Sequence, residues 1–360
     1  MNAQGEQDAG RVVVIGAGYA GLAAAARAGR GRAVTLIAPE RHFVNRVRLH
    51  EVAAGRSRHQ PAIARVLRGR NVTHVRARVT ELDLVGRKVF TDGGGDAVGY
   101  DTLVYALGSR TAWHDVPGAR EHAYPMERAE ELRERLRRDG GTVAVVGGGA
   151  TGIELAAEIA EAYPDRRVTI VAAREVGGWF SAAGKAIVHE RLRRLGVVVR
   201  ENSEVTAVDD AGLTTAAGRV DADVTVWAAS FDVGPLAAKS GLAVNERGEV
   251  LVDEYLHSVS HPEVYAVGDA AAVTLPGIGQ LRKGCATAEP MGRYVGDALA
   301  GGGAQPYAYG FVLQCLSLGR EAGLIQRVAK DDAMIERAYG GRVGRVVKAG
   351  IVRYIVRALR

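Results

Sequence analysis

Short apolar runs that break at glycine recur along the chain and predict alternating strands and helices. Residues Val12–Ile15 form an apolar run that ends at Gly16, and an alanine-rich stretch of helical character follows from Tyr19. Residues Thr142–Val146 end in the same way at Gly147, again before an alanine-rich stretch. Short buried strands that alternate with longer helices are typical of parallel sheets covered by helices. The pattern therefore predicts an α/β protein with an internal repeat.

Both units carry the same glycine spacing, Gly-x-Gly-x-x-Gly. The first glycine makes the turn from strand to helix, the second lets the backbone approach a diphosphate, and the third lets the helix lie close to the strand. The diphosphate then lies at the helix N-terminus, where unpaired N–H groups favour negative charge. One such motif can be a plain glycine turn, whereas two in strand–turn–helix context predict two dinucleotide sites. The candidate diphosphate-binding residues are Gly16, Ala17, Gly18, Tyr19, Ala20 and Gly21 in the first unit and Gly147, Gly149, Ala150, Thr151 and Gly152 in the second.

A second apolar strand follows each helix, and its end usually presents an acid to the adenosine ribose. Glu40, next to Arg41, is that candidate in the first unit, and Arg174 stands at the corresponding place in the second. A guanidinium can pair with a 2′-phosphate that a carboxylate would repel, so the second site leans slightly toward NADPH. Glu175 follows directly and leaves NADH open, and Arg174 can equally be a solvated loop charge.

Composition narrows the chemistry further. With 360 residues, of which 47% are apolar and 24% charged, the chain is long enough for two or three globular domains. An aromatic content of 6% argues against a platform that stacks nucleic-acid bases, and no nucleic-acid partner is expected. The two cysteines, Cys285 and Cys315, exclude a disulfide scaffold and a Cys-x-x-Cys redox pair. The histidines show no metal-ligand spacing, so no metal is implied.

The charge is concentrated at the C-terminus. Residues 342–360 carry six basic side chains and no acidic one, which equals the net charge of +6 of the whole chain. On a helical wheel the basic residues fall on one half, and the other half holds Val343, Val347, Ile351, Tyr354, Ile355 and Ala358. Such a helix can lie in a membrane interface, or it can dock on the protein with its basic side in water. Residues 1–10 read as a disordered polar tail without signal-peptide character, so a cytoplasmic protein is expected, with peripheral attachment to the inner membrane face left open.

Two further motifs complete a recognisable order. Gly268 and Asp269 follow a short apolar strand late in the chain, and Ala106 and Gly108 end another strand between the two repeats. With these motifs, residues 12 to about 299 resemble the flavoprotein oxidoreductases that have two dinucleotide-binding domains. The resemblance implies FAD on the first unit, NAD(P)H on the second, and a role for Asp269 at the ribityl and phosphate side of FAD.

Within that superfamily the chain looks most like the branch of type II NADH dehydrogenases and apoptosis-inducing-factor-like proteins. The residues that carry this similarity are Phe43 to Gly55, Gly149 to Glu154, Val226 to Phe231 and Ser317 to Arg320. It implies a carboxylate, Glu154, near the nicotinamide. Residues 285–291 depart from the quinone-reducing members because they lack the two glutamines that those members carry beside the flavin.

Glu154, His50 and Lys283 are candidates for catalytic roles, and Arg48 is a candidate cofactor contact beside His50. Glu154 lies one turn into the second glycine-motif helix between apolar neighbours, where burial would perturb its pKa, although it can instead stabilise the first helical turn. His50 and Arg48, on the loop after the first unit, are candidates to face the flavin or an acceptor, and His50 can equally be satisfied by a backbone carbonyl. Lys283 lies ahead of a predicted helix. It is a candidate to stabilise reduced flavin, and it can equally be a simple surface charge.

The expected architecture is two Rossmann-like domains, with the NAD(P)H domain inserted into the FAD domain and a small C-terminal module. We place the FAD domain at residues 11–112 and 240–305, the NAD(P)H domain at 113–239 and the module at 306–360. The expected function is hydride transfer from NAD(P)H to FAD and electron transfer to a quinone-like acceptor. A small organic substrate as the acceptor and a redox-regulated binding protein are the alternatives. The oligomeric state stays open, a homodimer included.

Overall fold

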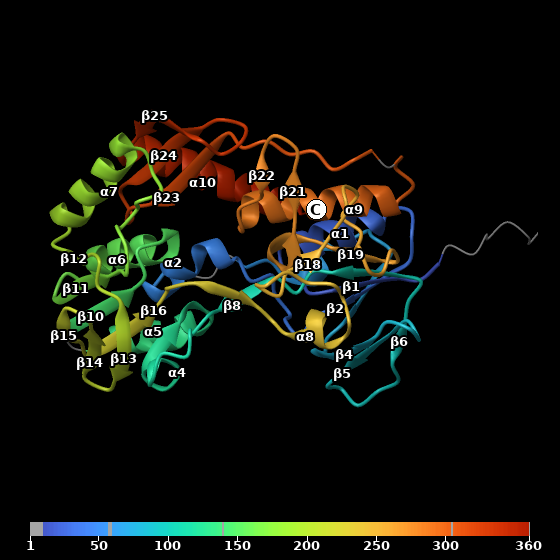
Figure 1. Ribbon diagram of the computed structural model, residues 1–360, viewed down its shortest axis with the longest axis horizontal. Helices are drawn as coiled ribbons and strands as arrows, with labels where there is room; N and C mark the ends of the chain where they lie inside the picture. Colours follow the sequence, from blue (N-terminus) through green and yellow to red (C-terminus); the bar gives the residue numbers. More distant parts are fainter. Residues whose placement is uncertain (1–9, 57–59, 139, 304, 360) are drawn as a thin grey trace, which may run out of the picture.

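The structure is a computed structural model that describes residues 10–56, 60–138, 140–303 and 305–359. The disordered tail expected at the N-terminus lies, apart from Gly10, outside the described residues. Two five-stranded parallel sheets, each flanked by helices, lie at opposite ends of an elongated molecule, and a C-terminal sheet and helix lie along one side (Figure 1). The predicted α/β class with two Rossmann-like units is confirmed.

The first sheet has the strand order β19-β7-β1-β2-β3, and all of its neighbours pair in parallel. Its strands are β1 (Val12–Ile15), β2 (Val34–Ile37), β3 (Val72–Val75), β7 (Thr102–Tyr105) and β19 (Val264–Ala266). A three-stranded antiparallel sheet, β4 (Val79–Asp83), β5 (Lys88–Thr91) and β6 (Val98–Gly99), is inserted between β3 and β7. Because β1 and β7 are central, the turns that follow them meet at the same carboxyl edge.

The second sheet repeats this plan with the order β12-β11-β10-β16-β9. Its strands are β9 (Ala123–Pro125), β10 (Gly141–Val146), β11 (Arg166–Val171), β12 (Val198–Arg200) and β16 (Val224–Trp227). Here too a three-stranded antiparallel sheet, β13 (Val205–Asp209), β14 (Gly212–Thr215) and β15 (Gly218–Asp221), precedes the strand that pairs with the central one. The internal repeat therefore extends beyond the glycine motif to the whole unit.

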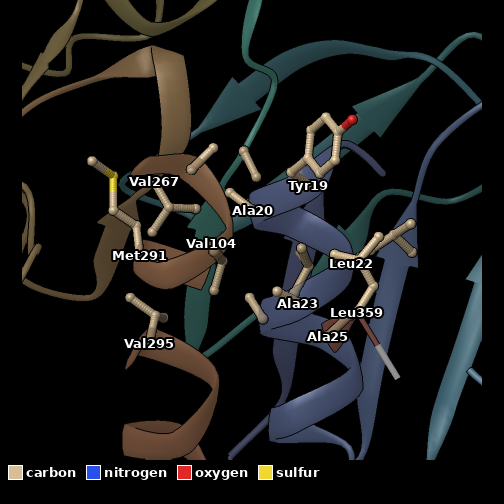
Figure 2. Packing of buried hydrophobic residues seen from close by; sticks show 14 of the residues in the cluster. Tyr19, Ala20, Leu22, Ala23, Ala25, Val104, Val267, Met291, Val295 and Leu359 are labelled. Carbon is tan, nitrogen blue, oxygen red and sulfur yellow. The ribbon is translucent and has the colours of Figure 1, made fainter. Parts of the chain in front are cut away.

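The alanine-rich composition of α1 (Tyr19–Ala28) reflects close packing against α9 (Cys285–Leu299). A Cβ at Gly292 would lie 2.1 Å from the Ala20 carbonyl oxygen, and one at Gly296 would lie 2.7 Å from that of Ala24. Figure 2 shows α9 beside α1, and Met291 and Val295 of α9 belong to the same hydrophobic cluster as the alanines of α1. Small residues thus hold the late helix α9 against the first glycine-motif helix, which places the N-terminus of α9 beside the first site.

The C-terminal module consists of the antiparallel sheet β23 (Leu313–Ser317), β24 (Gly323–Val328) and β25 (Met334–Tyr339), followed by α10 (Gly341–Ala358). Helix α10 lies against β24, where a Cβ at Gly344 would meet the Gly323 carbonyl oxygen at 2.2 Å. At its far end Leu359 is buried in the core of the first domain (Figure 2). The module therefore bridges both domains.

The faces that we predicted for α10 are partly wrong. Lys348, which the helical wheel put on the water-facing half, is 9% exposed, whereas Val343 and Tyr354 of the predicted apolar half are 62% and 63% exposed. The buried face instead contains Gly344, Lys348, Val352 and Ile355. The reason is steric: the close approach of α10 to β24 requires a glycine at the contact, and that glycine fixes which face turns inward.

The two domains are linked by an antiparallel pair, β8 (Ser109–Thr111) with β17 (Phe231–Val233). The strands of the second sheet lie in the chain between β7 and β19 of the first sheet, as expected for an inserted domain. The exact domain limits drawn from the sequence stay predictions. The remaining elements are α2 (Leu49–Ala53), α3 (Ile63–Val66), α4 (Ala119–His122), α5 (Ala129–Leu136), α6 (Ala150–Ala162), α7 (Ala182–Arg194), α8 (Leu236–Lys239), β18 (Val250–Leu251), β20 (Ala271–Ala272), β21 (Thr274–Leu275), β22 (Gly279–Gln280) and the 3-10 turns η1 (Arg46–Arg48), η2 (Met126–Arg128) and η3 (Gly268–Ala270).

Candidate active site

The first glycine turn joins β1 to α1 in the way that its spacing predicts. Gly16 has φ +98°, and a Cβ there would lie 2.4 Å from the Ala106 carbonyl oxygen. A Cβ at Gly21 would lie 1.9 Å from the Gly16 carbonyl oxygen. At Gly18, in contrast, no atom of the described residues other than its chain neighbours comes within 4 Å of a Cβ position. The first and third glycines are thus required by the protein itself, and the second leaves room for a ligand.

The second turn, between β10 and α6, repeats this geometry. A Cβ at Gly147 (φ +119°) would meet the Ala228 carbonyl oxygen at 2.5 Å, and one at Gly152 would meet the Gly147 carbonyl oxygen at 1.9 Å. Gly149 again has nothing within 4 Å in the described chain. Both turns place a helix N-terminus at this open position, with Ala150 and Thr151 in the first helical turn of α6. The residues present therefore fit two dinucleotide diphosphates.

Asp269 is fixed next to the first turn. Its carboxylate accepts hydrogen bonds from the Ser109 hydroxyl at 2.7 Å and from the Gly284 N–H at 2.9 Å. Ser109 begins β8, Asp269 itself lies in η3 after β19, and Gly284 precedes α9, so three parts of the chain converge on this carboxylate. Gly108 (φ +66°) and Gly268 (φ +71°) make the turns out of β7 and β19.

The candidate ribose contacts are exposed at the ends of the second strands. Glu40 and Arg41 follow β2, and Arg174 follows β11. Glu175, beside Arg174, forms an ion pair of 2.9 Å with Lys185. The acidic neighbour of Arg174 is therefore partly neutralised within the protein.

Three other predicted residues have partners within the chain. The buried Tyr19 hydroxyl donates to the Asn45 side-chain oxygen at 2.6 Å. Arg48 pairs with Glu51 at 2.6 Å, and Lys283 pairs with the buried Glu249 at 2.7 Å. Both residues are thus engaged in ion pairs within the protein, and their roles at the flavin stay predictions.

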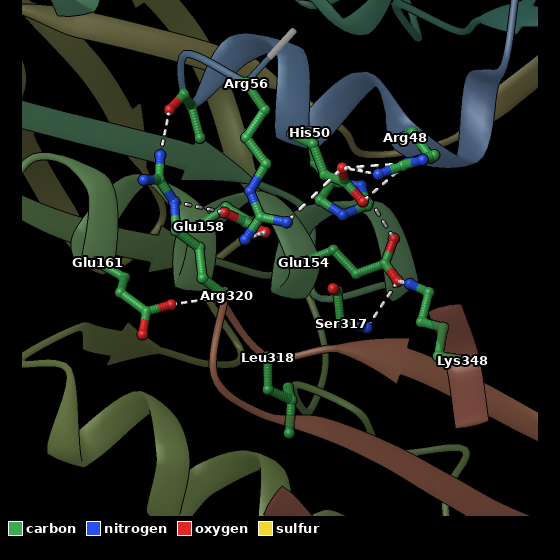
Figure 3. A network of polar contacts seen from close by, with 12 residues as sticks. Arg48, His50, Arg56, Glu154, Glu158, Glu161, Ser317, Leu318, Arg320 and Lys348 are labelled. Atoms are coloured by element: carbon green, nitrogen blue, oxygen red, sulfur yellow. Dashed lines mark hydrogen bonds and ion pairs between the residues drawn. The ribbon is translucent and has the colours of Figure 1, made fainter. Parts of the chain in front are cut away.

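Glu154 is the centre of a buried polar cluster where three parts of the chain meet (Figure 3). Its carboxylate forms an ion pair with Lys348 of α10 and accepts the Ser317 N–H of β23 at 2.9 Å. His50 Nδ1 of α2 lies 3.5 Å from the other carboxylate oxygen. The side chains of Glu154 and His50 are 10% and 3% exposed. The fold thus joins two predicted catalytic residues, Glu154 and His50, and adds Lys348, while Lys283 is engaged elsewhere.

Comparison with known proteins decides the family. The family described as pyridine nucleotide-disulphide oxidoreductase matches residues 10–291. The chain belongs to this family. An NADH dehydrogenase-like protein of Mycobacterium tuberculosis is 31% identical over 317 residues, which is 79% of each chain. The type II NADH:quinone oxidoreductase Ndh of the same organism is 30% identical over 319 residues, or 75% of this chain and 69% of that protein.

Among solved structures, NDH2 from Plasmodium falciparum in complex with NADH superposes with a TM-score of 0.81, covering 97% of each chain at 15% identity, and shows the same fold. The resemblance drawn from the sequence is confirmed. The protein is a flavoprotein oxidoreductase of the pyridine nucleotide-disulphide oxidoreductase family that uses FAD and a pyridine nucleotide.

The family name refers to a disulfide that is not reproduced in this chain. Cys285 and Cys315 are both free thiols. Burial raises the pKa of Cys285 to about 12 and also raises the pKa of Cys315. Both thiols are therefore protonated at neutral pH and are poor nucleophiles. Among the described residues, no group of three or more histidine, cysteine or acidic side chains is arranged to hold a metal ion.

His50 makes the stability of the protein depend on pH. Burial lowers the pKa of His50 from 6.5 to about 4, against the attraction of Glu154. A pKa that is depressed in the folded state gives stability that is full above pH 6.5 and is lost as the pH falls toward 4. This difference corresponds to about 3 kcal/mol. We expect His50→Gln to remove most of this acid sensitivity in denaturant unfolding at pH 7 and pH 5, and the exposed-site control His122→Gln to retain it.

Sequence reasoning missed Lys348, and it also missed Glu158, which lies one turn beyond Glu154 and is 0% exposed. Glutamates four residues apart in an otherwise apolar helix are the signal that could have indicated a buried polar side of α6. No comparable signal marks Lys348, because it is 194 residues away from Glu154 in the chain.

Proposed function

We propose that the protein is an FAD-dependent NAD(P)H dehydrogenase that passes electrons to a quinone-like acceptor. The observation that carries this proposal is the pair of glycine turns with matching geometry on two parallel sheets, which provides one site for FAD and one for NAD(P)H. The quinone is supported by relatives named as type II NADH:quinone oxidoreductases in Mycobacterium tuberculosis and Staphylococcus haemolyticus.

The chain's own residues bind and orient the two dinucleotides. We assign the turn from Gly16 to Gly21 to the FAD diphosphate, Glu40 to its ribose and Asp269 to its ribityl side. The turn from Gly147 to Gly152 is assigned to the NAD(P)H diphosphate. FAD held on the first turn would supply the two-electron redox chemistry between the pyridine nucleotide and the acceptor.

The buried cluster around Glu154 supplies an ionisable group for the reaction. Lys348 and the Ser317 N–H hold the Glu154 carboxylate in place, and His50, kept neutral by its burial, lies beside it. A carboxylate fixed by an ion pair and a backbone donor is suited to hold or pass a proton at one defined position. We therefore propose Glu154 as the proton-handling residue, with Lys348 and His50 as positioning residues.

The pyridine nucleotide and the acceptor are decided by one experiment, anaerobic stopped-flow spectroscopy of the flavin band. Mixing with NADH and NADPH separately identifies the donor, and addition of a short-chain quinone then tests the acceptor. We expect rapid bleaching and rapid recovery. The exposed Arg174, whose neighbour Glu175 pairs with Lys185, favours acceptance of NADPH. Bleaching without recovery would support the second candidate, a small organic acceptor, which the absence of glutamine from residues 285–291 favours.

We further propose that the outer face of α10 contacts an anionic membrane surface. No helix in the described part of the chain combines the length and apolar character needed to cross a bilayer. The outer face of α10 exposes both apolar and basic side chains: Val343, Val346, Val347, Tyr354, Arg342, Arg345, Arg353 and Arg357. Exposed apolar groups beside basic ones are typical of helices that lie in an interface.

This contact gives a testable prediction. Val346→Asp combined with Arg353→Glu should weaken binding to phosphatidylcholine–phosphatidylglycerol vesicles about tenfold or more, since each basic group near such a surface contributes about 1 kcal/mol. Vesicle co-sedimentation measures the effect. The control is Arg193→Glu on α7, where the side chain is also exposed. Equal loss with the control would mean that only overall charge matters.

A further inference from the structure

Helix α6 carries three glutamates on one side. Glu154, Glu158 and Glu161 are four and three residues apart, so they lie along the same face of the helix. Their side chains are 10%, 0% and 17% exposed. Figure 3 shows them in sequence from the Glu154–Lys348 pair toward the other end of the helix. An acidic row therefore leads from the candidate active site toward the C-terminal end of α6.

Glu158, in the middle of the row, is buried without a hydrogen bond. Its carboxylate oxygens lie 3.3 Å from Arg56 Nη2 and 3.7 Å from Arg320 Nε, and neither oxygen finds a hydrogen-bond partner within the described chain. Burial raises the pKa of Glu158 to about 7, although Arg56 and Arg320 lower it. Glu158 can therefore gain and lose a proton at neutral pH, which a carboxyl group in water does not do.

Solvent comes close to this carboxyl. A cavity of about 270 Å³ is lined by Ala54, Gly55, Arg133, Arg137 and Tyr163. The Arg320 side chain donates to the Ala54 carbonyl oxygen at 2.7 Å, and Arg56 directly follows Gly55. The two arginines that cover Glu158 therefore adjoin residues that line the cavity, and the side chains of Arg56 and Arg320 are 32% and 43% exposed.

The charged groups around Glu158 come from three elements. Glu51 of α2 and Arg56, three residues after the end of α2, belong to this group, and their side chains contact each other at 3.8 Å. The turn after β23 contributes Arg320, and α6 itself contributes Glu154 and Glu161. His50, next to Glu51 in the chain, lies on α2 between this group and Glu154, and its Nε2 has no hydrogen-bond partner among the described residues.

A quinone-reducing enzyme needs one proton from solvent in each turnover. The balanced reaction is NAD(P)H + H⁺ + quinone → NAD(P)⁺ + quinol. The hydride brings two electrons and one proton, while the quinol holds two protons, so the second proton must reach the buried site from outside.

We propose that Glu158 takes up this proton at the cavity and passes it along α6 toward Glu154. The proposal rests on the proposed function, since it requires an acceptor that is protonated on reduction. Side chains four residues apart on a helix have Cβ atoms about 5–6 Å apart, a gap that rotation of the glutamates or one water molecule bridges. Arg56 and Arg320 stabilise the ionised form, and burial favours the protonated form.

The test separates the two half-reactions in Glu158→Gln. Reoxidation of the reduced enzyme by a short-chain quinone should be at least about tenfold slower than in the wild type at neutral pH, because general acid–base groups contribute that much or more. In the wild type, reoxidation should slow above a pH of about 7, and the variant should lose this dependence. Reduction by NAD(P)H should be unchanged, and Glu158→Asp should restore part of the rate.

A measurement without turnover tests the same residue. An infrared band of a protonated carboxyl group should titrate near pH 7 in the wild type and be absent in Glu158→Gln. The matched control is Glu161→Gln on the same helix, also paired with an arginine, which should retain both the band and the pH dependence.

Three results would overturn the relay: an unchanged pH dependence in Glu158→Gln, equal slowing of both half-reactions, or the absence of the titrating band. If no quinone reoxidises the wild type, the proposed acceptor is wrong, and the proposed relay then has no quinone to protonate. Rapid reoxidation with an unaltered pH profile in the variant overturns the relay alone, so the two failures are distinguishable.

Discussion

A Gly149→Ala variant is expected to fold normally, to keep its FAD and to bind NAD(P)H at least about tenfold more weakly, a loss of about 1.4 kcal/mol or more. The backbone at Gly149 (φ −78°, ψ −178°) is allowed for alanine, and no described atom outside the adjoining residues lies within 4 Å of the new methyl group. The fold therefore tolerates the change. The methyl group would stand where the diphosphate must approach the helix N-terminus. The loss of affinity is measured from the rate of flavin reduction as a function of NAD(P)H concentration. The melting temperature checks that the fold is unchanged.

The neighbouring glycines provide sharp controls. Gly152→Ala would place its Cβ 1.9 Å from the Gly147 carbonyl oxygen, so this variant should lose stability as well as binding. Gly18→Ala repeats the open geometry in the first unit and should lose FAD, seen as loss of the yellow colour, without steric conflict in the protein. Full NAD(P)H affinity in Gly149→Ala would show that the nucleotide does not bind on this turn.

The parts of the fold that were predictable are those encoded by local patterns. The strands and helices around Gly16 and Gly147 could be located because apolar runs, glycine spacing and alanine-rich stretches are contiguous in sequence. The family resemblance followed from the order of these motifs with Asp269. The two antiparallel three-stranded insertions are also equivalent in the two units, but their sequences share no motif that would have revealed this.

The buried polar cluster could not be predicted, because its members come from distant segments. His50 and Glu154 were each identified as candidates, but their proximity depends on packing between α2 and α6. Lys348 was assigned to the wrong face of α10, since a helical wheel sorts side chains by polarity and contains no information on a glycine contact with β24. The charge of Lys348 is tolerated in the interior only because Glu154 lies opposite it.

Because Lys348 depends on this partner, we expect Glu154→Gln to destabilise the protein strongly. Removal of the carboxylate leaves the Lys348 ammonium group, whose side chain is 11% exposed, without its charged partner. Loss of one partner of a buried ion pair typically costs about 3–5 kcal/mol, because the remaining charge is left without compensation. We expect a decrease of this size in the free energy of unfolding, measured with denaturant in the FAD-loaded protein, and a similar decrease for Lys348→Met.

The double variant Glu154→Gln/Lys348→Met should recover most of this loss, because it removes both charges and leaves an uncharged side chain in each place. The coupling free energy from the double-mutant cycle then isolates the pair from the separate effects of each substitution. If the losses simply add, the two side chains do not interact and α10 is held by its apolar contacts alone. Recovered stability without recovered quinone-dependent turnover would assign to Glu154 a role in the reaction that its contribution to the fold does not explain.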